Sequence, residues 1–169
     1  TTDAEGYAVR DPGSTTFVGA IEPAEKFGSR LYAEAHRRGL WNALRVVLIG
    51  DGADWIRNIR DTHFPMALQI VDLYHAREHA TRIAVLTSRG NAARAEQRRI
   101  RWWDYLDEGN PEAIVFHARN TLPADNKARK EATQEIGYFE KNKDRLRYAT
   151  YRDEGLFVGS GVIEAGCKT

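Results

Sequence analysis

Two short, continuous runs of apolar residues stand out against a largely polar chain. One is VVLI within RVVLIGDGA (45–53), and the other lies within LQIVD (68–72). Neither run alternates with polar residues, which is typical of parallel strands buried on both faces. Between them, ADWIRNIRDTHF (53–64) has the apolar spacing of a short amphipathic helix, which Pro65 ends. The order strand, helix, strand predicts a βαβ unit.

The chain before this unit predicts one more strand and one more helix. TTFVGAIE (15–22) contains β-favouring residues and is short enough for a strand. Pro23 then opens a helix, because proline favours the first helical position. The apolar residues that follow recur near the helical period: Phe27, Leu31, Ala35 and Leu40.

The second half of the chain has a helical pattern from His75 to about Arg152, with many Ala, Glu, Arg and Lys. Turn sequences divide this stretch at 88–90, 109–111 and 122–123. An apolar run and a Gly-Ser-Gly turn come next, and Ser160 is suited to cap a final helix.

We therefore predict an α/β fold with three segments. Residues 1–75 form the N-terminal part of the core, residues 76–152 form an all-helical insertion, and residues 153–169 return to the core. The length of 169 residues fits one domain with a proper hydrophobic core.

Composition excludes several classes of protein. The single cysteine, Cys167, excludes a disulfide framework and a cysteine-based zinc site, and it suits a reducing cytoplasm. No apolar run approaches the length that a membrane span needs, so we expect no membrane partner.

Positive charge is concentrated in one segment although the net charge is only +1. Between residues 77 and 101 there are seven Arg and two Glu, and RRIRWW (98–103) adds adjacent tryptophans. Such a segment can contact a phosphate backbone and stack on bases. The alternative is a solvated helix face whose tryptophans point into the core.

Carboxylates follow both predicted core strands. Asp51 lies between two glycines at the end of the first strand, and Asp72 ends the second. Ligands and chemistry collect at the carboxyl ends of strands in open α/β sheets. Glu164 follows much later in the chain, beside glycines at the start of the final helix. Acidic side chains from separate elements can together hold hard cations such as Mg²⁺.

DLYHAREH (72–79) has two interpretations. His75, Glu78 and His79 spell H-x-x-E-H, in which two His bind zinc and the Glu is the general base of a metalloprotease. Glu154 would then be a candidate third ligand. Alternatively, Asp72 and His75 form an Asp-x-x-His pair at the end of a strand. A zinc pair at His75 and His79 needs an established helix at a point where we expect a strand–helix junction.

The combined pattern resembles one family. VVLIGDGADWI, IVDLYHAREH, the helical block and YFEKNKDRLRYATYRDEGLFVGSGVIEAGCK are similar to the catalytic domain of DDE insertion-sequence transposases of the ISKra type. The resemblance covers nearly the whole chain and is most specific from Tyr138 to Lys168. It implies an RNase H-like fold, with a mixed sheet flanked by helices and an all-helical insertion before the last acidic residue.

The resemblance also implies roles for particular residues. Asp51 matches the second catalytic and metal-binding Asp, Glu164 matches the final catalytic Glu, and Asp72 with His75 matches an accessory Asp-x-x-His element. Two Mg²⁺ or Mn²⁺ ions would activate water to cut DNA at the transposon end, and the freed 3′-hydroxyl would attack target DNA. Candidate DNA contacts are Arg77, Arg98, Arg99, Arg101 and Lys168.

Expectations about the whole protein come from the same resemblance. The partners would be transposon-end and target DNA, the assembly a homodimer or higher oligomer, and the location the bacterial cytoplasm, at the nucleoid during reaction. The family's first catalytic Asp lies on a strand upstream of Thr1, and the chain ends shortly after Glu164. We therefore expect this fragment to be inactive alone; a non-catalytic α/β DNA-binding remnant is a further interpretation.

Overall fold

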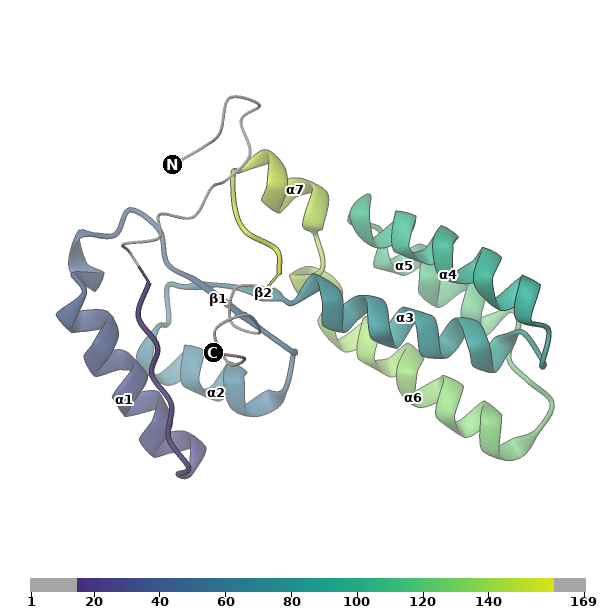
Figure 1. Cartoon of the computed structure of the whole chain (residues 1–169), viewed down its shortest axis with the longest axis horizontal. Helices are drawn as coiled ribbons and strands as arrows, with labels where there is room; N and C mark the ends of the chain where they lie inside the picture. The colour runs from purple at the N-terminus through teal and green to yellow at the C-terminus, as the bar shows by residue number, and fades with distance from the viewer. Residues whose placement is uncertain (1–14, 160–169) are drawn as a thin grey trace. The chain divides into compact units, whose positions relative to one another are not determined.

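The structure, a computed structural model, describes residues 15–159 (Figure 1). These residues belong to two compact units, one that reaches Ile70 and one that comprises Val71–Gly159. The chain is mostly helical, with a small parallel sheet flanked by helices, which is consistent with the predicted α/β class.

The first unit contains the βαβ element that the sequence predicts. Its strands form a two-stranded sheet, and Leu68 N donates to Val46 O over 3.0 Å where their pairing begins. A small core of Ile59, Phe64 and Ala67 packs against apolar side chains from the preceding helix. In chain order the elements are α1 (Ala24–Arg37), the 3-10 helix η2 (Leu40–Asn42), β1 (Val47–Gly50), α2 (Asp54–His63) and β2 (Leu68–Val71).

Two predictions for this unit are wrong. Residues 15–22 form no strand: Phe17 is 62% exposed and Ile21 is fully exposed. A strand needs the backbone groups of a neighbour, and β1 and β2 pair only with each other within the described residues. The second wrong prediction is that both strands are buried on both faces. Three of the four residues of β2 are buried, but all four residues of β1 are only half-buried.

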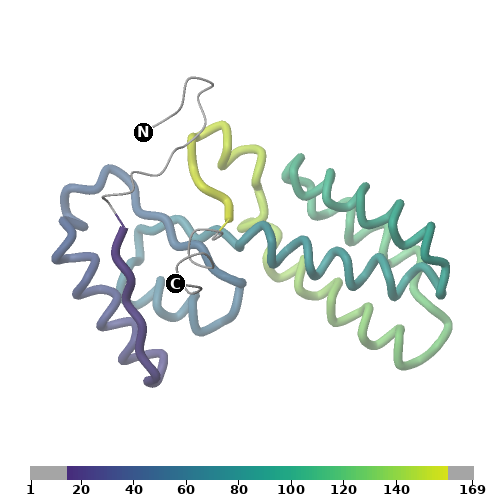
Figure 2. Tube along the Cα trace, in the orientation of Figure 1, coloured from purple at the N-terminus to yellow at the C-terminus, as the bar shows by residue number. Residues whose placement is uncertain are grey.

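The second unit is helical, as predicted from His75 onward. Figure 2 shows that the chain reverses direction between successive long helices of this unit. In chain order the elements are α3 (Leu73–Thr87), α4 (Ala92–Asp107), α5 (Pro111–Arg119), α6 (Asn126–Asn142), the 3-10 helix η3 (Lys143–Arg145) and α7 (Tyr148–Asp153). Helix α3 packs against α4 and α6, and α5 packs against α6.

Capping side chains explain where these four helices begin. Each starts after an Asp or Asn whose side chain accepts a backbone N–H from the first turn, and such a cap satisfies an otherwise unpaired donor. Pro111 occupies the start of α5, where its missing N–H costs nothing. The four caps are Asp72, Asn91, Asn110 and Asp125.

The core of the second unit depends on small residues in α3. Ala76, Ala80 and Ala84 are fully buried and allow the neighbouring helices to approach closely. Large side chains fill the space around them, including Trp102, which is 2% exposed, and Phe139, which is fully buried. At Trp102, the interpretation of a tryptophan pointing into the core is confirmed.

Replacing Gly137 with Ala should stabilise the second unit. Gly137 lies in the interior of α6, and a Cβ added there meets no atom within 4 Å. Alanine lowers the backbone entropy of the unfolded chain, so the free energy of unfolding should rise by about 0.5–1 kcal/mol. Urea denaturation followed by circular dichroism measures this change. Gly109→Ala is the contrasting variant and should destabilise, because Gly109 has φ 71°.

Candidate functional site

Asp51 follows β1 in a loop whose shape depends on the flanking glycines. A Cβ on Gly50 would lie 2.5 Å from Cδ1 of Ile56, so α2 packs where any other side chain would stand. Gly52 has φ 89°, a conformation that other residues rarely adopt. The Asp51 carboxylate accepts the Ala53 N–H over 2.8 Å, and the residue is exposed. The Gly-Asp-Gly motif thus holds an accessible carboxylate directly after a strand.

Glu164 and Lys168 lie outside the described residues. Their predicted roles as the final catalytic acid and as a DNA contact therefore remain predictions.

Asp72 is the N-cap of α3. It is 5% exposed, and one carboxylate oxygen accepts the backbone N–H of Tyr74 over 2.8 Å and of His75 over 3.1 Å. Because α3 begins at Leu73, His75 lies within an established helical turn. The expectation that a strand–helix junction prevents His75 and His79 from sharing a helix face is therefore wrong.

Asp72→Ala should destabilise the second unit by about 0.5–2 kcal/mol, because the first turn of α3 loses its cap. Asp72→Asn should retain most of the stability, since an asparagine side chain also accepts backbone N–H groups. Thermal unfolding of both variants checks this order. Equal losses in both variants would show that the charge, rather than the cap, is what matters.

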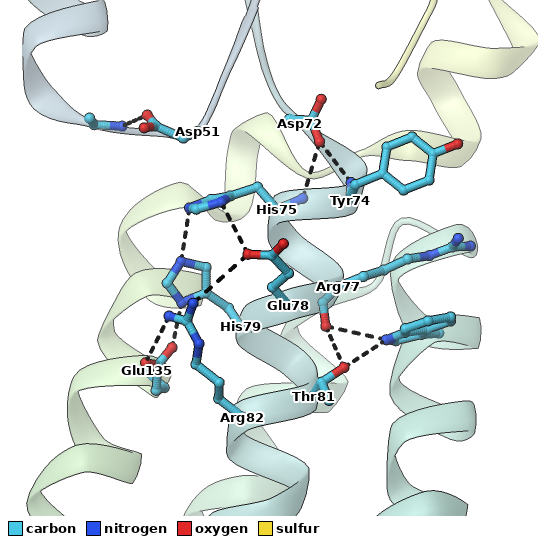
Figure 3. A network of polar contacts seen from close by, with 12 residues as sticks. Asp51, Asp72, Tyr74, His75, Arg77, Glu78, His79, Thr81, Arg82 and Glu135 are labelled. Atoms are coloured by element: carbon cyan, nitrogen blue, oxygen red, sulfur yellow. Dashed lines mark hydrogen bonds and ion pairs between the residues drawn. The ribbon is translucent and has the colours of Figure 1, made fainter. Parts of the chain in front are cut away.

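A connected polar network runs from the start of α3 to α6 (Figure 3). The Nε2 atoms of His75 and His79 are 3.1 Å apart, and Nδ1 of His79 contacts Glu135 of α6 at short range. Tyr138, one turn further along α6, stacks on His79 with ring centroids 3.7 Å apart and planes 16° from parallel. The network also includes Arg82, whose guanidinium is 3.7 Å from Glu135.

His79 is therefore not a surface residue, although it lies in a segment rich in charged residues. Its side chain is 15% exposed, and this burial lowers the pKa of His79, which favours the neutral imidazole. Glu78 does remain at the surface, with 63% of its side chain exposed, and contacts His75 Nδ1 at 3.7 Å and Arg82 at 3.8 Å. The sequence did not single out Glu135 or Tyr138; their distance along the chain from His79 hides the contact.

Arg77 and Arg99 form ion pairs with acidic side chains of the same chain. Arg77 donates to Asp107 over 2.6 Å, and Arg99 pairs with Glu96 over 2.5 Å. Both guanidinium groups also lie over the indole of Trp103, at 4.8 and 4.2 Å from the ring. A phosphate would have to compete with these partners.

Arg98 and Arg101 have a different environment. Arg98 donates to the Thr87 carbonyl over 2.6 Å, and its pKa is lowered by burial and by nearby arginines. Arg101 lies 4.3 Å from the ring of Tyr105 and 3.6 Å from Glu108. Both line a groove of about 390 Å³ on α4 and α5, where Tyr105 also bonds the exposed His117 over 3.1 Å. The side chains of this basic–aromatic groove include Arg94, Arg98, Arg101, Trp102, Tyr105 and His117.

No family model, curated protein or solved structure matches this chain. Within residues 15–159, no group of three or more His, Cys, Asp and Glu side chains is arranged to hold a metal ion, so Glu154 does not join His75 and His79. In the same part of the chain, no helix is long and apolar enough to cross a membrane.

Proposed function

We propose that this chain is part of the RNase H-like catalytic domain of a DDE-type transposase of the ISKra type. The observation that carries the proposal is the exposed Asp51 carboxylate, which follows a strand of a parallel βαβ unit and precedes Gly52 in a conformation that favours glycine. The helical stretch between that strand and Glu164 supports it, because the family has a helical insertion before its last acidic residue.

The chemistry would be metal-dependent cleavage of a phosphodiester bond followed by strand transfer. Asp51 and Glu164, together with the first catalytic Asp of the family, would hold two Mg²⁺ or Mn²⁺ ions, since hard cations prefer carboxylate oxygens. These ions would activate the attacking oxygen and neutralise charge on the leaving oxygen. Asp72 would contribute indirectly, by fixing the first turn of α3 and so the backbone of His75.

DNA would contact the helical unit through the basic–aromatic groove. Arg98 and Arg101 line this groove together with Arg94, whereas Arg77 and Arg99 lie against Trp103. Guanidinium groups beside aromatic rings suit phosphate contacts and base stacking. The partners would be transposon ends and target DNA, bound by a homodimer or a higher oligomer in the bacterial cytoplasm.

Binding of Mn²⁺ to the 169-residue chain tests the proposed metal site. Electron paramagnetic resonance should detect bound Mn²⁺ in the unmodified chain, and the affinity should fall at least about tenfold in Asp51→Asn and in Glu164→Gln. Asp61→Asn is the matched control, because Asp61 is an exposed acid of α2 that pairs with Arg60. Mn²⁺ affinity that is identical in all four proteins would overturn the proposed site.

A further inference from the structure

The two imidazoles at the start of α3 face each other on one side of the helix and are joined by a hydrogen bond between their Nε2 atoms. Their Nε2 atoms are 3.1 Å apart, while the ring centroids are 4.7 Å apart and the planes are 79° apart. At this distance the two nitrogens share one proton in a hydrogen bond, and a metal ion that replaces the proton would bind the same two atoms.

The spacing of the two nitrogens also suits a shared metal ion. In a tetrahedral zinc site with Zn–N distances near 2.0–2.1 Å, two histidine nitrogens lie about 3.3 Å apart. The Nε2 atoms of His75 and His79 come within a few tenths of an ångström of that separation. Residues four apart on one helix face provide this pairing without any change in the backbone.

Carboxylates occupy the opposite side of both rings. Nδ1 of His79 faces Glu135, and Nδ1 of His75 is 3.7 Å from Glu78 (Figure 3). The Glu135 carboxylate retains a proton on Nδ1 of His79 and leaves its Nε2 unprotonated, which is the tautomer that binds metals. A divalent cation would displace the proton between the two Nε2 atoms, and the His75 proton would move to Nδ1, which Glu78 faces.

The pair is also held in place before any ion arrives. Stacking on Tyr138 fixes the His79 ring, and Arg82 lies 3.7 Å from Glu135 on its other oxygen. His75 is more open, with 35% of its side chain exposed, so an ion and its remaining water ligands can reach the site. One ligand is thus rigid and the other faces solvent.

We propose that His75 and His79 form a two-histidine site for one divalent transition-metal ion of the class that prefers imidazole, such as Zn²⁺, Ni²⁺ or Cu²⁺. Water completes the coordination, since the residues that the structure describes bring no third His, Cys, Asp or Glu to the pair. This site is separate from the proposed Mg²⁺ site, whose ligands are carboxylates, and it does not depend on the transposase proposal. Glu78, on the Nδ1 side of His75, is not placed as the base of a protease.

Isothermal titration of the 169-residue chain with Zn²⁺, after purification without a histidine tag, tests this site. We expect one Zn²⁺ per chain, with an affinity at least about tenfold lower in His75→Gln and in His79→Gln. His117→Gln is the matched control, because His117 is an exposed histidine of α5 whose ring nitrogen bonds Tyr105. Zn²⁺ should also raise the melting temperature of the unmodified chain but not of His75→Gln.

The carboxylate behind His79 provides a second, independent variant. Glu135→Gln should weaken Zn²⁺ binding by about 10- to 100-fold, whereas Glu140→Gln, on the same helix but paired with Arg119, should not. Should His79→Gln fail to fold, the more exposed His75→Gln decides the question. Absence of Zn²⁺ binding, or binding that His75→Gln leaves unchanged, would overturn the proposal. Mn²⁺ binding that requires Asp51 should persist in His75→Gln, which distinguishes the two sites.

Discussion

Asp51→Asn should reduce divalent-cation-dependent DNA cleavage by at least about 10³-fold in the product of the whole reading frame that contains this chain. Metal ions contribute several kcal/mol to phosphoryl transfer, and each 1.36 kcal/mol is a factor of ten in rate. Asparagine keeps the shape of the side chain and its bond to the Ala53 N–H, but it removes the charge that binds the cation. Cleavage of a labelled transposon-end duplex, measured with Mg²⁺ and with Mn²⁺, gives the rates.

Two comparisons make this result specific to the carboxylate. Asp61→Asn changes an exposed acid of the same unit and should leave the rate unchanged. Thermal unfolding should show that Asp51→Asn is folded, since Gly52 and the bond from the Ala53 N–H, which asparagine can also accept, hold the loop without the charge. A rate in Asp51→Asn within about tenfold of the unmodified protein would contradict the proposed role of Asp51.

The helical half of the fold could be predicted because its signals are local. Caps such as Asn91 and Asn110 and the proline at 111 act within one turn, so the sequence alone shows where these helices begin. The strand predicted at 15–22 was wrong for the opposite reason. A strand depends on a partner, and β-favouring residues without one remain exposed, as Phe17 does.

The candidate site shows the same division between local and distant information. Asp51 could be identified because its glycines and its strand are adjacent in the chain. The contact between His79 and Glu135 spans 56 positions and has no sequence signal. Asp72 has a local role, but Asp is common both at helix starts and in catalytic sites, so residue type alone could not distinguish the cap from a catalytic acid.

The arginines between residues 77 and 101 show that many positive charges in a sequence do not by themselves identify a binding surface. Arg77, Arg98, Arg99 and Arg101 were equivalent as candidates in the sequence. In the structure Arg77 and Arg99 lie against Trp103, while Arg98 and Arg101 line the groove. Helical spacing already separates the arginines of α4: Arg98 and Arg101 share one face with Tyr105, whereas Arg99 shares another with Trp103. Only the contact of Arg77 with Trp103 comes from the packing of α3 on α4, which has no signal in the sequence.

The second unit should lose stability above about pH 10 because of Tyr148. This residue is fully buried at the start of α7, and its hydroxyl donates to the Val71 carbonyl over 2.9 Å. Burial raises the pKa of Tyr148 well above its usual value. In the unfolded chain the Tyr148 hydroxyl therefore ionises first, near pH 10. The contribution of Tyr148 to stability is complete below that pH and is lost as the pH rises toward the pKa of the folded state. The free energy of unfolding should fall by up to about 1.4 kcal/mol per pH unit from this residue.

Tyr148→Phe isolates this contribution. The variant should be less stable by about 1–3 kcal/mol at pH 8, because the buried Val71 carbonyl loses its donor. The free energy of unfolding of the variant should nevertheless fall less steeply between about pH 9.5 and 11, the range around the usual tyrosine pKa. Some dependence on pH should remain, because burial also raises the pKa of Tyr151.

Tyr74→Phe is the matched control, since Tyr74 is 55% exposed, and its free energy of unfolding should fall with pH as steeply as that of the unmodified chain. Urea denaturation at each pH measures all three proteins. Parallel curves for Tyr148→Phe and the unmodified chain would mean that the Tyr148 hydroxyl does not resist ionisation in the folded state.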